Sequence, residues 1–188
     1  TNEDSESPRS GRRSFGVRAH RTTRPIRKRI LKPGRERGPV SDASKKIVPQ
    51  KDELRIIPLG GLEEVGRNMT VFEYNDDIVI LDMGLQFPEE DMPGIDYIIP
   101  DTRYLEGKEK NIRGVILSHG HLDHIGAAPH LLPKLGWPPV YASRLTLFLL
   151  RKRLEESNLA QYLVAHEIKS ADEELSLGDY FKVSLFEV

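Results

Sequence analysis

The feature that most constrains the fold is a short apolar run, residues 113–118, that leads directly into a cluster of metal-binding side chains. The cluster holds His119, His121, Asp123 and His124. Imidazole nitrogen and carboxylate oxygen suit zinc, and also manganese or iron. A buried strand that ends in a tight loop can point such side chains at one centre, and we expect Gly120 to supply the unusual backbone dihedrals. Four ligands of this kind can serve two adjacent ions, whereas a histidine-rich surface loop is the plainer alternative.

Composition narrows the chemistry and divides the chain. None of the 188 residues is cysteine, so thiolate metal sites and disulfides are excluded. Residues 1–52 hold 15 Lys and Arg against 6 Asp and Glu, a formal charge of +9, whereas residues 53–188 carry −10. Apolar residues are sparse in the first part. We therefore predict a disordered basic extension over 1–52 and a folded domain over 53–188.

The extension contains a basic tract bounded by prolines. Its cationic residues are Arg24, Arg27, Lys28, Arg29 and Lys32. Clustered cations attract phosphate backbones without regard to base sequence, which favours a nucleic-acid-binding arm. A solubilising or targeting tail is an equally simple interpretation of the charge alone.

No run of apolar residues reaches the roughly 20 that a membrane helix needs, and we expect a cytoplasmic protein without membrane contact.

The folded part mixes strands and helices. Apolar runs predict strands at 54–59, 69–74, 78–82 and 140–142, with turn residues at 75–77 that favour a hairpin. A short helix is expected over 127–135, with Pro129 in its first turn. Ser143 is a plausible N-cap for a helix to about residue 156. A last strand is expected from residue 180. These elements predict a layered α/β sandwich rather than a purely parallel sheet.

The cluster resembles the H-x-H-x-D-H signature of the metallo-β-lactamase superfamily, which its four residues fill without a gap. Asp82, at the end of the predicted strand 78–82, resembles the earlier acid of that superfamily. The resemblance implies an αββα sandwich, of which residues 53–188 would form the N-terminal portion. It also implies that Asp82 supports the ligands from outside the coordination sphere.

Further blocks resemble the ribonuclease J family, whose members also carry a β-CASP domain. They are residues 59–68, 82–89, 94–101 and 125–127. With the metal loop they cover most of residues 54–142. Glu63 and Leu122 depart from the usual residues of the family, but neither departure removes a ligand.

The family implies a two-metal ribonuclease that cuts RNA from the 5′ end and internally, in RNA processing and decay, including that of ribosomal RNA. Two zinc ions, with manganese as the alternative, would be held by His119 and His121 on one side and by Asp123 and His124 on the other. Asp123 and His124 would also act in catalysis. A calcium ion is implied near Gly94 and Asp96, although a simple turn explains these two residues equally well.

The same resemblance implies further ligands and the β-CASP domain downstream, and residues 186–188 resemble the strand before the next histidine. We therefore interpret the chain as an N-terminal fragment, inactive alone, of a parent that forms homo-oligomers. Two alternatives stay open. One is another hydrolase of the same superfamily, such as a thioesterase or β-lactamase. The other is an RNA-binding fragment without turnover.

Overall fold

The computed structural model describes residues 51–170 and 173–185. The predicted basic tract within residues 24–33 and the predicted strand end at 186–188 lie outside the described residues. Among the helices of the described part, none combines the length and the apolarity that a membrane crossing requires.

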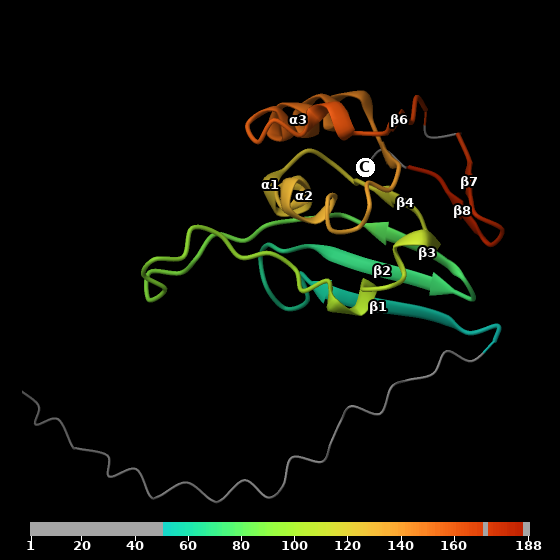
Figure 1. Cartoon of the computed structure of the whole chain (residues 1–188), viewed down its shortest axis with the longest axis horizontal. Helices are drawn as coiled ribbons and strands as arrows, with labels where there is room; N and C mark the ends of the chain where they lie inside the picture. The colour runs from blue at the N-terminus through green and yellow to red at the C-terminus, as the bar shows by residue number, and fades with distance from the viewer. Residues whose placement is uncertain (1–50, 171–172, 186–188) are drawn as a thin grey trace, which may run out of the picture. The chain divides into compact units, whose positions relative to one another are not determined.

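A six-stranded mixed sheet forms the centre of the described part (Figure 1). Its strands lie side by side in chain order, as β1 (Leu54–Gly60), β2 (Met69–Tyr74), β3 (Asp77–Leu81), β4 (Ile112–Ile116), β5 (Val140–Ala142) and β6 (Ala165–Glu167). The pairs β1–β2 and β2–β3 are antiparallel, and the three pairs from β3 to β6 are parallel. The predicted hairpin and the predicted mixed α/β fold are both confirmed.

Short helices connect the parallel strands. They are α1 (Leu122–Ile125), α2 (Ala128–Leu131) and α3 (Arg144–Glu155), with 3₁₀ turns η1 (Arg103–Leu105), η2 (Glu109–Asn111) and η3 (Ala160–Tyr162). The predicted start of α3 is confirmed, because Ser143 Oγ accepts a hydrogen bond from the Thr146 amide. The helix expected over 127–135 is only the four residues of α2, with Pro129 in its first turn.

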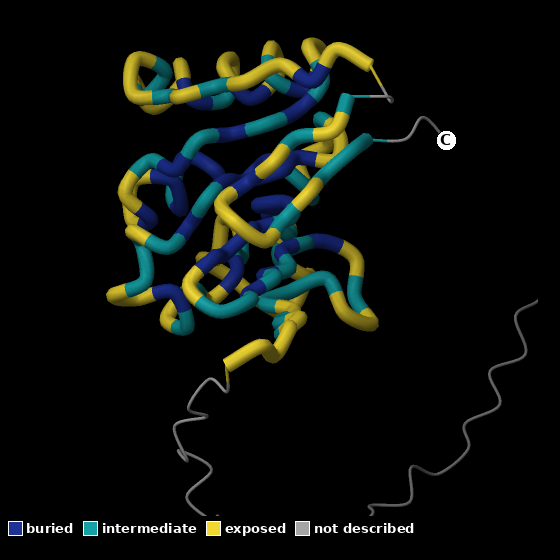
Figure 2. Tube along the Cα trace, turned by 90° about the vertical axis from the view of Figure 1, so that its right-hand side faces the viewer, coloured by how far each residue is buried: buried dark blue, intermediate teal, exposed yellow. Residues whose placement is uncertain are grey.

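The two faces of the sheet pack against different layers because side chains alternate along a strand. Ile78 and Ile80 of β3 join the main core with Leu150 and Leu154 of α3. Val79, between them in sequence, packs on the opposite face. There it meets the hairpin of β7 (Leu175–Leu177) and β8 (Phe181–Val183). Buried residues accordingly lie in the interior, and the outer side of α3 is exposed (Figure 2). Helices, sheet and hairpin supply three of the layers expected of an αββα sandwich.

The parallel pairing of β3 with β4 determines where the site lies. Leu81 pairs with Ile116, so both strands end at the same edge of the sheet. Asp82 follows the first strand, and Ser118 follows the second by two residues. Ligand sites in α/β sheets form outside the carboxyl ends of parallel strands, and the predicted metal loop leaves the sheet at this edge.

Candidate metal centre

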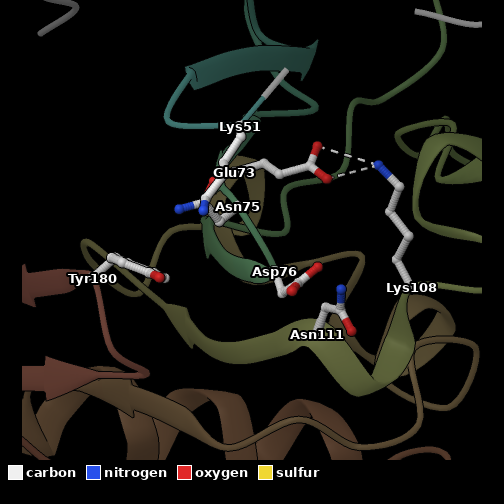
Figure 3. Close-up of a pocket in the computed structure, with 7 residues that line it drawn as sticks. All are labelled: Lys51, Glu73, Asn75, Asp76, Lys108, Asn111 and Tyr180. Carbon is white, nitrogen blue, oxygen red and sulfur yellow. Dashed lines mark hydrogen bonds and ion pairs between the residues drawn. The ribbon is translucent and has the colours of Figure 1, made fainter. Parts of the chain in front are cut away.

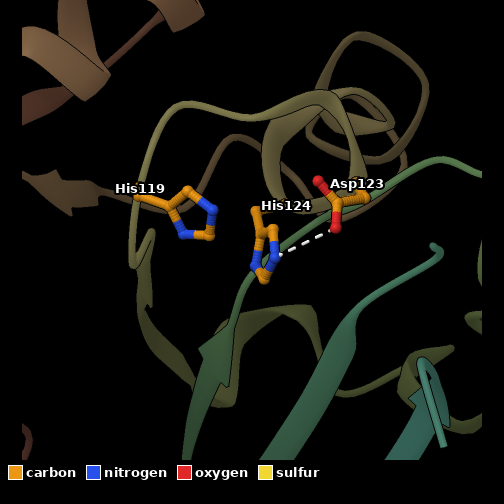
Figure 4. Close-up of side chains that lie close together, drawn as sticks. All are labelled: His119, Asp123 and His124. Atoms are coloured by element: carbon orange, nitrogen blue, oxygen red, sulfur yellow. Dashed lines mark ion pairs between the residues drawn. The ribbon is translucent and has the colours of Figure 1, made fainter. Parts of the chain in front are cut away.

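Three of the predicted ligands converge closely. One ligand atom from each of His119, Asp123 and His124 lies within 4.8 Å of the others (Figure 4). His119 comes from the loop after β4, and the other two come from α1. His121 lies beside them, with its Nδ1 3.1 Å from His119 Nε2. The structure therefore brings all four predicted side chains together, on a partly exposed surface.

Asp82 lies behind the histidines and forms hydrogen bonds with Ser118 and His124. Its carboxylate accepts hydrogen bonds from the Ser118 amide at 2.8 Å and from Ser118 Oγ at 2.9 Å. It also lies 2.8 Å from His124 Nδ1. The residue is buried, with 5% exposure, and its backbone takes a left-handed φ of 63°, which aspartate tolerates better than most residues. The arrangement fits the predicted supporting role of Asp82.

The hydrogen-bond partners assign the tautomers of two imidazoles. His124 Nδ1–H donates to Asp82, so its Nε2 carries the lone pair. Ser118 Oγ donates its single proton to Asp82 and lies 3.1 Å from His119 Nδ1, so it accepts from that nitrogen. His119 Nε2 then carries the lone pair, with His121 Nδ1 3.1 Å from it. A lone pair on Nε2, with the other nitrogen donating to a protein group, is the usual state of a metal-ligating histidine.

Electrostatics keep one of these imidazoles uncharged. Burial lowers the pKa of His119 below its ordinary value, and the nearby His124 and His121 lower it further. Asp82 and Asp123 act in the opposite direction but do not reverse the shift. A neutral imidazole at physiological pH is the form that binds a metal ion.

The backbone after β3 fixes the position of α1. Residues 83–85 run along this short helix, and the Met83 amide donates to the His124 carbonyl at 2.7 Å. A Cβ on Gly84 would lie 1.6 Å from the carbonyl oxygen of Asp123. Only glycine permits so close an approach, because a backbone carbonyl cannot move aside as a flexible side chain can. The helix that carries Asp123 and His124 is thus held by main-chain contacts.

The predicted reason for glycine at position 120 is wrong. Gly120 does not have a positive φ. A Cβ there would instead lie 2.4 Å from Leu149 Cδ1, so the glycine makes room for a side chain of α3. The motif is also not a loop throughout, because its second half forms α1. Four residues are too few to show helical periodicity in a sequence.

The donor set and the local charge both fit a divalent cation. Glu73, Asp77 and Asp82 are the buried carboxylates of the described residues. Glu73 is paired with Lys108, and Asp77 is paired with Arg113. Within the part of the chain that the structure describes, Asp82 pairs only with an imidazole, and Asp123, close by, has no lysine or arginine partner. Two carboxylates without a permanent cation favour a bound metal ion.

The predicted calcium ligands lie elsewhere. Gly94 and Asp96 are exposed residues of the loop between β3 and η1. Gly94 has a φ of 84°, as a turn glycine does. The grouping of three or more ligand-type side chains found in the described part is the one around His119, and Asp96 is not in it. The calcium site stays a prediction.

One hollow in the described part of the surface lies away from the cluster, and another borders it. A cavity of about 480 Å³ lies at the other end of β3 and β4 (Figure 3). It is lined by Lys51, Glu73, Asn75, Asp76, Lys108, Asn111 and Tyr180. A smaller hollow of about 310 Å³ borders Asp123. The cluster is partly exposed, and the smaller hollow lies at its side.

Three residues of the site carried no predicted role. They are Asn68, Gly84 and Ser118, which contact the ligands through hydrogen bonds or close packing. Asn68 and Gly84 stand in the sequence blocks that resemble ribonuclease J, so a signal existed, but nothing in the blocks says what either residue contacts.

The sequence of the chain is similar to those of known proteins. The family model described as the metallo-beta-lactamase superfamily matches residues 62–183. Ribonuclease J of Thermus thermophilus is 46% identical over 140 residues, which cover 72% of this chain and 24% of that protein. Ribonuclease J of Synechocystis is 42% identical over 134 residues, covering 71% of this chain and 21% of that protein. The chain thus spans about a quarter or less of the length of these two relatives.

Solved structures are more distant. The crystal structure of human tRNase Z, short form, covers 63% of this chain and 46% of its own, with 17% sequence identity and a TM-score of 0.41.

Proposed function

The chain belongs to the metallo-β-lactamase superfamily, and from that premise we propose that it is the metal-binding part of a ribonuclease of the ribonuclease J type. The observation that carries the proposal is the cluster of His119, Asp123 and His124 within 4.8 Å, with Asp82 bound behind it. The substrate follows from the relatives, which are named ribonuclease J and are 46% and 42% identical to this chain.

Each side chain has a role in the proposal. His119 and His121 would hold one ion, and Asp123 and His124 would hold the other, with zinc expected and manganese as the alternative. Such ions activate water and neutralise charge on a phosphate. Asp82 and Ser118 keep two imidazoles in the ligating tautomer. Asp123 and His124 are the proposed catalytic residues.

The whole activity belongs to a longer protein in this proposal. Four ligands shared by two ions give each ion only two, fewer than the three protein ligands of a typical catalytic zinc site. We therefore expect weak metal binding and little RNA hydrolysis by the 188 residues alone. Cleavage from the 5′ end and internally, a homo-oligomeric state and a cytoplasmic location are part of the same proposal.

Two peripheral sites are proposed with it. Gly94 and Asp96 would contribute to a calcium site. The basic extension would bind RNA without sequence preference, through Arg24, Arg27, Lys28, Arg29 and Lys32. Counterion release makes such binding weaken steeply with salt. Removing residues 1–52 should reduce RNA affinity, and the reduction should be larger at low salt; unchanged affinity at both salt concentrations would refute the arm.

A chimera tests the function. The Thermus thermophilus enzyme is 46% identical to this chain over 140 residues, and its matching segment would be replaced by residues 53–188 of this chain. We expect metal-dependent cleavage of RNA that chelators abolish, and complete loss with Asp123→Ala or His124→Ala. A folded chimera that hydrolyses a thioester or a β-lactam instead of RNA would support the competing hydrolase function.

A further inference from the structure

Asn68 reaches the cluster from a loop that is tightly folded before it. A Cβ on Gly61 would lie 2.3 Å from Asn68 Oδ1, and Gly61 has a φ of 82°, which favours glycine. Glu64 closes the same loop by accepting from the Gly61 amide at 2.9 Å and by pairing with Arg67. The position of Asn68 is therefore built into the local structure.

The Asn68 side chain binds both residues of the proposed second ion position. Its Nδ2 donates to the Asp123 carbonyl at 3.0 Å and to Asp123 Oδ2 at 3.2 Å. The same nitrogen lies 3.3 Å from His124 Nε2. The Asn68 backbone adds two bonds, from its own amide to the Asp123 carbonyl and from the Gly84 amide to its carbonyl.

These contacts reduce the repulsion between two hydrogen-bond acceptors, one on Asp123 and one on His124. Asp123 Oδ2 and His124 Nε2 lie 3.2 Å apart. Because His124 donates its Nδ1 proton to Asp82, its Nε2 faces the carboxylate with a lone pair. Two acceptors at this distance repel each other unless a donor or a cation lies between them. The amide nitrogen of Asn68, with two hydrogens and no free lone pair, is that donor.

We propose that Asn68 is a positioning residue that holds Asp123 and His124 in the ligating orientation before a metal ion arrives. The inference rests on the proposed function, since it assigns these two side chains to one ion. The amide nitrogen cannot itself ligate a cation. Its hydrogen bond to the Asp123 carbonyl persists when the ion takes over the two ligand atoms.

Two variants and one control test the role by metal titration. Asn68→Leu keeps the size and removes both donors, whereas Asn68→Ser keeps one shorter donor. Asn111→Ala is the matched control, because Asn111 lies at the other end of β4. Cobalt and zinc affinity of the 188-residue chain should fall about 10–100-fold in Asn68→Leu and less in Asn68→Ser, the usual range for groups that orient ligands. The cobalt absorption bands of the leucine variant should also shift.

A metal-free crystal structure of the wild type and of Asn68→Leu gives the second readout. In the leucine variant the Asp123 carboxylate should turn away from His124 Nε2 or occupy several orientations. A folded Asn68→Leu variant with unchanged affinity, unchanged cobalt spectrum and unchanged carboxylate orientation would overturn the proposal. If the wild type bound no metal, the proposed function would fall, and the metal-free structures would still decide the role of Asn68.

Discussion

Two buried aspartates lie at the two ends of strand β3, and they differ in the partners that meet their charge. Asp77, at the start, pairs with Arg113 and accepts hydrogen bonds from the Asp179 and Tyr180 amides. Asp82, just after the end, receives hydrogen bonds from Ser118 and His124 and has no lysine or arginine partner among residues 51–170 and 173–185. Both are at most 5% exposed, so burial does not separate them.

A buried structural carboxylate and a buried functional one differ in whether a cationic side chain balances the charge. The charge of Asp77 is balanced within the protein, and a balanced buried pair needs nothing further. The charge of Asp82 is met by donors that also orient metal ligands, and a second carboxylate, Asp123, lies next to the same imidazole. The unbalanced negative charge of Asp82 and Asp123 favours the binding of a cation from solution.

The largest expected effect is that of Gly84→Ala, which would displace α1 and the metal cluster near Asp82 without touching the surroundings of Asp77. A Cβ on Gly84 would lie 1.6 Å from the Asp123 carbonyl, and backbone cannot yield. We expect a loss of at least about 3 kcal/mol in the free energy of unfolding, together with loss of metal binding. Urea unfolding measures this. Gly107→Ala is the control. Nothing lies within 4 Å of a Cβ at Gly107, its φ is 78°, and only about 1–2 kcal/mol of backbone strain is expected.

Asp77→Asn should lower the free energy of unfolding by about 2 kcal/mol, because the Arg113 pair and charged hydrogen bonds are lost, and should leave metal affinity unchanged. Burial alone would raise the pKa of Asp77, but Arg113 and the amides of Asp179 and Tyr180 outweigh it and hold the pKa below its ordinary value. This stability is therefore present at neutral pH and lost as pH falls through the folded-state pKa.

Unfolding of the wild type and of Asp77→Asn at neutral pH and at about pH 3 checks the pH dependence. The two proteins should differ most at neutral pH and converge in acid. A difference that stays constant over this range would show that the charge of Asp77 contributes nothing.

Asp82→Asn should show the reverse pattern. We expect metal affinity to fall about 10–100-fold, because the amide holds the His124 imidazole less well, and metal-free stability to change less than in Asp77→Asn. Calorimetric titration with zinc, paired with urea unfolding, measures both quantities. Equal effects of the two substitutions on metal affinity would remove the distinction between the two ends.

Ser118→Ala should have the smallest effect, about a fivefold loss of metal affinity, because one hydrogen bond to Asp82 and one to His119 disappear while the Ser118 amide still binds Asp82. Ser118→Thr retains the hydroxyl and should restore affinity. A threonine variant as weak as the alanine variant would argue against the hydroxyl.

Much of this site could be predicted because its ligands are neighbours in sequence. His119 to His124 span six residues after an apolar strand, so their spacing alone indicated a common centre. The strands 69–74 and 140–142 were predicted with their observed bounds, since apolar residues and turn signals delimit them.

The supporting residues could not be predicted in the same way. Asn68 lies 55 positions before Asp123, and their contact depends on how β2, β3 and β4 pair. Gly84 is constrained by a close approach of two backbones that no local pattern encodes. Strand β6 is as short as β5, but its residues, Ala-His-Glu, lack the apolar character that marked β5.

The central claim is that the carboxyl ends of β3 and β4 form a divalent-metal site. Calorimetric titration of the 188-residue chain with zinc, beside an otherwise identical chain carrying His119→Ala and Asp123→Ala, tests it most directly. We expect a weak, saturable binding heat in the wild type and none in the double variant. Asp77→Asn should bind zinc as the wild type does. Equal zinc binding by the wild type and the folded double variant would contradict it.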